Sequence, residues 1–284
     1  MEGTITSQPG PDAPAPDPLF QSALCGVDGT LRSYAAVEQA AALVGAGGRL
    51  TLLAVTATGS AGESRSAAIS PKRAERVLAH ARQLARHAGA DVTTEIEPEG
   101  PAQRVILERA ADHDLLALGA PWISWLGGLI LEGVASAALG AVRTPVLAAR
   151  AVPGGIERFA ERILLASDAS DESDELVEMA IAMALPRSGH VTLLHVAGVE
   201  SRSRPHHIEA QGARLADALT GGSEVRVEVG DPDDEIVDVA GVGGNTLVVM
   251  GSRRASGVSA LGSVSRKVLH NAHCSVLLVP PGDR

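Results

Sequence analysis

Apolar residues form two kinds of pattern along this chain, and the two kinds alternate. Short runs almost without polar residues, such as 191–194 and 247–250, are typical of strands buried on both faces of a parallel sheet. Between such runs, apolar residues recur at helical spacings that place them on one face. Two such sets are Val37, Ala40, Ala41 and Val44 in the first half, and Leu176, Met179, Ala180, Met183 and Ala184 in the second. Alternating strands and amphipathic helices predict a doubly wound α/β architecture.

The strand-like runs occur twice, in the same order. Residues 22–30 align with 162–170, 49–55 with 190–196, 114–119 with 245–251, and 144–148 with 274–279. Four anchors in one order indicate a duplicated unit. We therefore predict two tandem Rossmann-like doubly wound domains, each with a five-stranded, mostly parallel sheet. The domains are expected at residues 19–150 and 156–282, with the junction at residues 153–155.

Composition narrows the class of protein. The 284 residues carry 34 acidic and 24 basic side chains, and an acidic surface repels nucleic acid and anionic lipid. The uncharged stretch 115–131 is interrupted by glycine and proline and is shorter than the roughly 20 apolar residues that a spanning helix needs. Neither a nucleic-acid nor a membrane partner is therefore expected.

The cysteines and the first residues bear on the compartment. Cys25 and Cys274 lie far apart in the sequence and belong to no Cys-x2-Cys motif, which favours a reducing cytoplasm. Residues 1–18 are rich in proline and lack a basic segment followed by an apolar core. They are expected to form a disordered tail rather than a secretory signal.

The stretch 247–265 has the layout of a phosphate cradle. An apolar run ends at Met250, a polar loop spaced by glycines follows, and Gly262 and Ser263 precede a helix. Backbone N–H groups at a helix start stabilise an anion, and glycine lets the backbone approach a ligand closely. In doubly wound sheets, ligands bind beyond the carboxyl ends of the strands, where Asp168, Val196 and Gly251 are expected.

Together these motifs resemble the universal stress protein family, in a tandem two-domain form, over nearly all of residues 19–282. The resemblance rests on the strand-end aspartates Asp28 and Asp168, on the Leu-Leu-His-Val sequence at 193–196, and on the Met-Gly-Ser-Arg loop that leads into Gly-Ser-Val-Ser at 262–265. Family members divide into ATP binders, which carry a Gly-x2-Gly-x9-Gly-Ser/Thr loop, and non-binders that lack it.

The resemblance implies ATP as the ligand of the second domain, with Mg²⁺ as an optional companion. It assigns Asp168 to the adenosine part and Ala166, Ser167 and Val196 to the base pocket. Met250, Gly251, Ser252, Arg253, Arg254 and Gly257 would form the loop, and Gly262, Ser263, Val264 and Ser265 would hold phosphates. Charge agrees with these roles, since a carboxylate repels phosphate and suits adenine or ribose donors.

Each domain departs from the family loop. In the second, Arg254 stands at the second glycine position, and seven residues rather than nine separate it from Gly262. Gly257 can supply the turn there, and the guanidinium can pair with phosphate. In the first, Trp122 takes the second glycine position and Trp125 follows closely. We therefore expect one nucleotide site, in the second domain, and one site filled by tryptophan.

Other polar residues have structural interpretations. Asp28 is expected to cap the following helix, and the imidazoles of His270 and His273 to meet a helix dipole rather than a metal. The pair 206–207 is expected to be solvated, and the acids at 231–235 to begin a helix. No catalytic residue is assigned, because no Gly-x-Ser-x-Gly elbow or Walker-type lysine accompanies the cradle.

The sequence thus favours a cytoplasmic stress-response protein that binds adenine nucleotide as a structural or signalling state. Two alternatives stay open: a nucleotide-free interaction scaffold, and a slow ATP hydrolase that uses Arg254 and the carboxylates at 231–235. The apolar strands near 146–147 and 276–279 offer edges through which the two domains would pair within one chain. The sequence does not decide whether a homodimer also forms.

Overall fold

The computed structural model describes residues 19–56, 69–98, 101–120, 143–197, 205–252 and 262–281. The first half contains β1 (Ser22–Gly26), α1 (Leu31–Val44), β2 (Arg49–Thr56), α2 (Pro71–Arg86), β3 (Asp91–Pro98), α3 (Ala102–Ala110), β4 (Leu115–Gly119) and β5 (Val146–Ala149). The second contains β6 (Arg162–Ala166), α5 (Ser173–Ala184), β7 (His190–Ala197), α6 (Pro205–Ala218), β8 (Ser223–Val229), α7 (Pro232–Val242), β9 (Leu247–Gly251), α8 (Ser263–Asn271) and β10 (Ser275–Val279).

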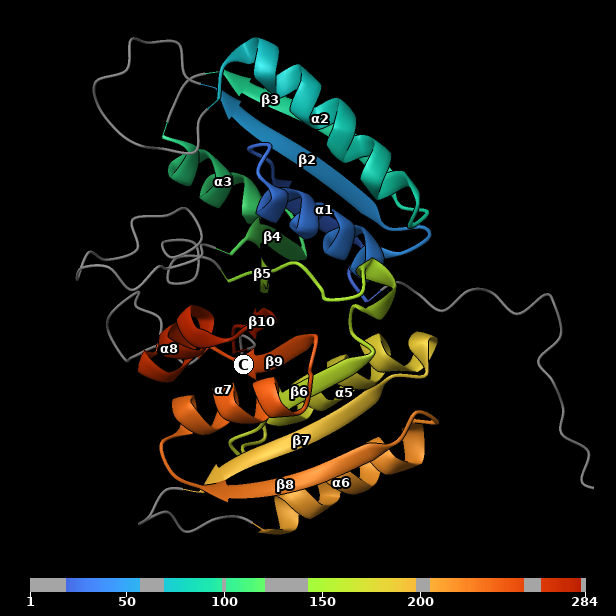
Figure 1. Ribbon diagram of the computed structural model, residues 1–284, viewed down its shortest axis with the longest axis vertical. Coiled ribbons are helices and arrows are strands. Elements are labelled where there is room, and N and C mark those ends of the chain that lie inside the picture. Colours follow the sequence, from blue (N-terminus) through green and yellow to red (C-terminus); the bar gives the residue numbers. More distant parts are fainter. Residues whose placement is uncertain are drawn as a thin grey trace, which may run out of the picture.

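All ten strands belong to one sheet, in the order β3-β2-β1-β4-β5-β10-β9-β6-β7-β8 (Figure 1). Within each half the strands are parallel, and the order 3-2-1-4-5 is the same in both. The predicted tandem doubly wound α/β fold is confirmed. The two five-stranded sheets are continuous with each other, because β5 and β10 pair antiparallel.

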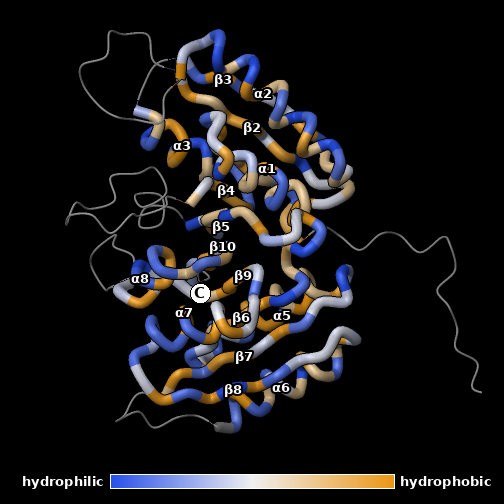
Figure 2. Tube along the Cα trace, in the orientation of Figure 1, coloured by the Kyte–Doolittle hydropathy of each residue, from blue (hydrophilic) through white to orange (hydrophobic). Residues whose placement is uncertain are grey.

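Helices cover both faces of the sheet, which explains the uninterrupted apolar strands (Figure 2). On one face, α1 and α2 of the first half and α5 and α6 of the second contribute to a single apolar core that crosses the junction. On the other face, α3 covers the first half, and α7 and α8 cover the second, over two separate cores. The two domains are therefore joined by the apolar core beneath α1, α2, α5 and α6 as well as by the β5–β10 pair.

Buried polar groups fasten the β5–β10 junction. The Gln39 side chain on α1 donates to the Arg150 carbonyl at 2.6 Å and accepts from the Ser275 hydroxyl at 2.8 Å, and the Arg150 N–H donates to Ser275 Oγ at 2.9 Å. Gln39 and Ser275 are each 1% exposed. Because buried amide and hydroxyl groups are costly without partners, this closed set of hydrogen bonds fixes the junction in one register.

Two arginines extend this junction to helix ends. The Arg150 guanidinium donates to the carbonyl oxygens of Leu269 and of Cys274, the latter at 3.1 Å, and so covers the C-terminal end of α8. Arg187 donates to the carbonyls of Met183 and Ala42, both at 2.9 Å, and so joins the C-terminal ends of α5 and α1. Cations at helix C-termini are stabilising, because the unpaired carbonyls there carry partial negative charge.

His270 differs from the expectation that its imidazole meets the helix dipole as a cation. Burial, followed by the nearby Arg266 and Arg150, lowers the pKa of His270. The guanidinium of Arg150 takes the position at the end of α8, and a second cation beside it is unfavourable. The favoured form of His270 is therefore the neutral one.

The stretch 115–131 begins as strand β4, and its residues 121–131 lie outside the described residues. Within the described part of the chain, every helix is too short or too polar to cross a membrane. Residues 1–18, for which a disordered tail was predicted, also lie outside the described residues.

Replacing Arg150 by Met should lower the free energy of unfolding by about 2 kcal/mol, because it removes charged donors from the carbonyls of Leu269 and Cys274. Chemical denaturation followed by circular dichroism measures this. The matched control is Arg104→Met, which breaks an exposed i,i+4 pair with Glu108 and should cost less than about 0.5 kcal/mol. Equal losses in the two variants would contradict the assignment.

The lowered pKa of His270 predicts a loss of stability in acid. Below the ordinary histidine pKa of about 6.5, the unfolded chain binds this proton before the folded chain does, so the unfolding free energy falls as pH decreases. Above that pH the group contributes nothing to the pH dependence. His270→Gln should flatten the curve between about pH 7 and 5. A curve unaltered by His270→Gln would refute this.

Candidate functional site

The strand order places a crevice at the carboxyl ends of β6 and β9. The chain runs from β6 outward to β7 and β8, then returns to β9 on the other side of β6. β6 and β9 pair directly, with Ala166 opposite Met250. At such a reversal the loops that follow the two strands leave in opposite directions, which opens a crevice suited to ligands.

A cavity of about 680 Å³ occupies this position, within the size range of small-molecule sites. It is lined by the ends of β6, β7 and β9, the N-terminal parts of α5, α7 and α8, and the chain after β10. The lining residues are Ala166, Ser167, Asp168, Ser170, Glu172, Ser173, Glu175, Leu176, Leu194, Val196, Pro232, Ile236, Met250, Gly251, Ser252, Gly262, Ser263, Val264, Ser265, Val279, Pro280 and Pro281.

The cavity brings together every predicted site residue that the structure describes. They come from four separate segments: residues 166–168, Val196, residues 250–252 and residues 262–265. Arg253, Arg254 and Gly257 lie outside the described residues, as do Trp122 and Trp125. The sequence did not identify the contributions of α5, of α7 and of Pro280 and Pro281. Leu194 had a signal, because it stands two residues before Val196 on the same face of β7.

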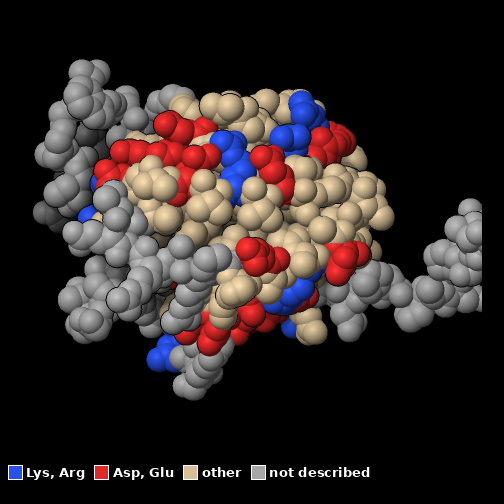
Figure 3. Space-filling model, turned by 90° about the horizontal axis from the view of Figure 1, so that it is seen from below, with Lys and Arg blue, Asp and Glu red and all other residues tan. Residues whose placement is uncertain are grey.

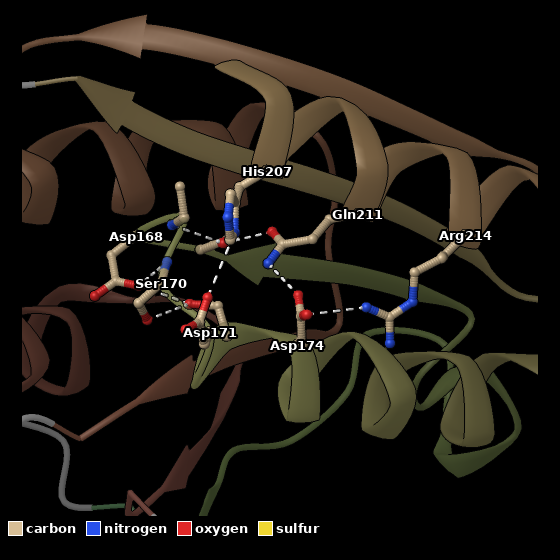
Figure 4. Close-up of polar contacts among 10 residues, drawn as sticks. Asp168, Ser170, Asp171, Asp174, His207, Gln211 and Arg214 are labelled. Carbon is tan, nitrogen blue, oxygen red and sulfur yellow. Dashed lines mark hydrogen bonds and ion pairs between the residues drawn. The ribbon is translucent and has the colours of Figure 1, made fainter. Parts of the chain in front are cut away.

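Asp168 shapes the turn between β6 and α5 (Figure 4). Its Oδ1 accepts hydrogen bonds from the Ser170 N–H at 3.0 Å and from the Ser173 hydroxyl at 2.7 Å. Between Asp168 and Ser170, Ala169 adopts a φ of 59°, in the left-handed region. The carboxylate therefore lies at the cavity wall with its turn already organised, which is the preorganisation that a ligand contact needs.

The equivalent turn of the first domain corrects one expectation. Asp28 does not cap α1 itself: its Oδ1 accepts from the N–H and hydroxyl of Thr30, at 2.9 and 2.7 Å. Thr30 is the N-cap residue, and its hydroxyl accepts from the Ser33 N–H. Asp28 thus acts one step removed, by orienting the capping threonine.

Ser167, at the cavity wall, is fixed by hydrogen bonds to residues outside the cavity lining. Its hydroxyl donates to Gln211 Oε1 at 2.8 Å and accepts from the Ala169 N–H at 3.1 Å. Gln211 in turn donates to Asp174 at 2.8 Å, and the His195 Nδ1 donates to the Ser167 carbonyl at 3.0 Å. These bonds fix the backbone of the base pocket predicted from the sequence.

Of the histidine pair 206–207, which was expected to be solvated, only His206 is fully exposed. The His206 side chain is 97% exposed, but that of His207 is 39% exposed and its Nδ1 lies 3.8 Å from Asp171. His207 therefore belongs to the polar contacts between α5 and α6 that Figure 4 shows.

The N-terminal ends of α8 and α5 both line the cavity, and the two helices cover opposite faces of the sheet. No side chain caps this end of α8 among the described residues, and the first backbone bond of the helix runs from the Arg266 N–H to the Gly262 carbonyl. The N–H groups of Ser263, Val264 and Ser265 precede that bond and have no partner within the helix, which is the arrangement that binds anions at helix starts.

The Ser265 hydroxyl already has an acceptor within the chain. Ser265 Oγ donates to the Gly251 carbonyl at 3.3 Å, and a hydroxyl has one proton to donate. Its contribution toward an anion would therefore come from the backbone. The Ser252 hydroxyl similarly donates to the Val279 carbonyl at 3.4 Å, which ties the loop after β9 to the end of β10.

The charged residues of the cavity are carboxylates. Asp168, Glu172 and Glu175 line it near α5, and its described lining contains no lysine or arginine. The nearby Lys267 pairs with the buried Asp233 at 2.8 Å, which connects α8 to the first turn of α7. That turn carries Asp233, Asp234 and Glu235 after the N-cap Asp231, as expected for acids at a helix start. The described residues contain no cluster of three His, Cys, Asp or Glu side chains that could hold a metal ion.

In the first domain the start of α1 lies close against the end of β4. α1 begins at Leu31, whereas α5 begins at Ser173, which corresponds to position 33 of the first domain. A Cβ on Gly119 would lie 2.7 Å from the Arg32 backbone carbon and 2.9 Å from the Ser33 nitrogen. Among the described residues, a Cβ on Gly251 would meet Leu176 alone, at 3.8 Å. The end of β4 therefore has less room beside α1 than the end of β9 has beside α5.

The fold and the cavity define a tandem doubly wound α/β protein with a ligand crevice in its second half. A model of the universal stress protein family matches residues 20–150 and again residues 160–280. The chain therefore belongs to the universal stress protein family, as two tandem domains.

Individual relatives agree. The universal stress protein YxiE of Bacillus subtilis is 31% identical over 144 residues, which cover 42% of this chain and 97% of that protein. The universal stress protein Sll1388 of Synechocystis is 28% identical over 148 residues, which cover 42% of this chain and 96% of that protein. The crystal structure of a universal stress protein from Archaeoglobus fulgidus matches with a TM-score of 0.73 at 20% identity, over 92% of this chain and 99% of that one, and shows the same fold.

The difference between the two glycines predicts different tolerance to alanine. Gly119→Ala should lower the free energy of unfolding by roughly 1–3 kcal/mol, because the new methyl meets the backbone of α1. Gly251→Ala, its matched control in the second domain, should change it by no more than about 0.5 kcal/mol. Thermal and chemical denaturation measure both. Similar losses at the two positions would contradict this difference in room.

Proposed function

We propose that this protein binds one adenine nucleotide, ATP, in the cavity of its second domain, and that occupancy serves as a structural or signalling state in a stress response. The observation that carries the proposal is that the N-terminal end of α8, which has no side-chain cap among the described residues, lines the same cavity as Asp168. The cavity thus offers N–H donors for phosphate oxygens and a carboxylate for adenine or ribose donors.

The apolar middle of the cavity supports the same ligand. Leu194, Val196, Ile236 and Met250 line it, and such side chains suit the faces of a purine ring. Ser167 and Ala166 lie beside them at the end of β6. The order of contacts from base to phosphate would then run from the ends of β6 and β7 toward α8.

Mg²⁺ would enter with the nucleotide rather than be held by a protein cluster. The carboxylates of Asp168, Glu172 and Glu175 repel a polyphosphate, and a cation bound to the phosphates offsets that repulsion. The Asp233 carboxylate, proposed as a metal ligand for a hydrolase, is paired with Lys267.

A binding role is favoured over catalysis. Efficient phosphoryl transfer needs a cationic clamp, a metal and an oriented nucleophile, and the described lining supplies no cation. We place the protein in the cytoplasm as part of the same proposal. Cys25 and Cys274 are unpaired and buried, and burial raises the pKa of the Cys274 thiol to about 11, as suits inert thiols of a reducing compartment.

The first test is to extract and identify nucleotide from the purified chain, and then to titrate the nucleotide-free protein calorimetrically with ATP, GTP, AMP and cAMP. One equivalent of ATP per chain is expected. Ligand at 100 times its Kd should stabilise the protein by about 2.7 kcal/mol. Two equivalents of ATP per chain would contradict a single site. If the purified protein retains no nucleotide and ATP gives no shift in melting temperature, the interaction scaffold is favoured.

Asp168→Ala and Asp28→Ala form a matched pair for this test. Each removes an aspartate that organises the turn after the first strand of its domain, but only Asp168 lines the cavity. ATP affinity should fall at least tenfold in Asp168→Ala and stay unchanged in Asp28→Ala. Equal loss in both would refute the assignment, whereas phosphate release that disappears only in Asp168→Ala would favour the slow hydrolase.

A further inference from the structure

The two outer strands of the ten-stranded sheet are β3 and β8. Each is hydrogen-bonded to a neighbouring strand on one side, β2 or β7. An outer strand presents a row of backbone N–H and C=O groups that can pair with another chain. The two outer strands carry very different side chains, and those of β8 are the ones suited to pairing with another chain.

β8 exposes three valines in alternation. Val225, Val227 and Val229 are 45%, 56% and 66% exposed. Because side chains alternate along a strand, the three share one face. That face is the one beneath α6, since a Cβ on Gly212 of α6 would lie 2.5 Å from Val225. Exposure increases along the strand away from this contact.

Polar contacts tie α6 to α5. Gln211 and Arg214 bind Asp174, Arg214 also binds Glu178, and His207 faces Asp171 (Figure 4). All of these acids precede or belong to α5. α6 also packs on β8, where Gly212 meets Val225, and the partly exposed valines give the outer strand an apolar stripe.

The charges on the other face of β8 have a self-complementary order. Glu224, Arg226 and Glu228 alternate with the valines, and Arg226 pairs with Glu228 at 2.8 Å within the chain. Viewed from below, this end of the molecule shows uncharged surface with charges of both signs interspersed (Figure 3). A strand with this order can satisfy both its charges and its valines against a copy of itself.

We propose that β8 pairs antiparallel with β8 of a second copy of this chain, about a twofold axis at Val227. In this register Val227 lies opposite Val227 of the second copy, Val225 opposite Val229, and Arg226 opposite Glu228. The twofold symmetry makes the Val225–Val229 and Arg226–Glu228 pairs occur twice, whereas the central Val227 pair occurs once. Directly opposed side chains have Cβ atoms about 4.5–5.5 Å apart, so the valines form one stripe and the charges form two ion pairs across the junction.

Other registers satisfy fewer groups. An axis at Arg226 places Arg226 against Arg226 and Glu224 against Glu228, which is repulsive. An axis at Val225 pairs Glu224 with Arg226 but sets Val227 opposite Ser223 and leaves Val229 beyond the strand. Only the axis at Val227 opposes all three valines to one another. A twofold contact closes on itself, so it yields a dimer with a continuous sheet and not a filament.

β3 does not offer the same surface. It carries Asp91, Glu95 and Glu97 and ends at Pro98, so two copies would oppose like charges, and the proline has no N–H to donate. By register, Ile96 is the counterpart of Val227, because Ile96 pairs with Ala54 and Val227 with His195. Ile96 is 39% exposed and therefore provides a matched control position.

The test is the molar mass of the full chain in solution, measured by sedimentation velocity and light scattering over a range of concentrations. The wild type should approach twice the chain mass as concentration rises. Val227→Glu, which places two carboxylates at the axis, should remain at the mass of one chain. Ile96→Glu should behave as wild type. Circular dichroism and the melting temperature establish that each variant is folded.

Charge reversal tests the register itself. Arg226→Glu and Glu228→Arg should each abolish the doubling of mass, because each creates like charges across the junction, and the double variant should restore it. Mass of one chain in the wild type at every concentration would overturn the proposal. So would a dimer that survives Val227→Glu, a dimer lost in Ile96→Glu, or a double variant that stays monomeric. None of these outcomes depends on nucleotide binding.

Discussion

The antiparallel pairing of β5 with β10 is the interaction on which the rest of this structure depends. It turns two five-stranded sheets into one, and it brings Arg150 from the first domain to the C-terminal end of α8 in the second. The N-terminal end of the same helix forms part of the cavity. Because a helix of nine residues is short and stiff, the position of its cavity end is set partly by contacts at the domain junction. The first domain thus supports the cavity of the second.

The two domains share one architecture but differ at the carboxyl ends of their central strands. Strand order, register and the aspartate turn after the first strand are common to both. The first turn of α1 packs against Gly119 at the end of β4. The end of β9 keeps more room at Gly251 and lines the cavity.

The polar contacts of α6 have two consequences at once. Gln211 orients Ser167 at the cavity wall, while Gln211 and Arg214 hold the helix against Asp174 of α5. The same helix packs on β8, where Gly212 meets Val225 while Val227 and Val229 stay exposed. α6 therefore contacts both the residues behind the cavity wall and the outer strand. The ion pairs involved are partly exposed, so their effect is chiefly on the placement of the helix and only modestly on stability.

The sequence alone determined the fold class, because continuous apolar strands and amphipathic helices in alternation are compatible with few architectures. It also identified the segments around Asp168, Val196, Gly251 and Gly262, since a duplicated pattern and a glycine-spaced loop are local signals. Tertiary structure alone decided what depends on distant contacts. The close approach of Arg32 and Ser33 to Gly119, the engagement of the Ser265 hydroxyl by Gly251, and the neutral form of His270 beside Arg150 all arise between segments that are not adjacent in the chain. No local pattern records which backbone will lie against which, and that is why these features were beyond the sequence.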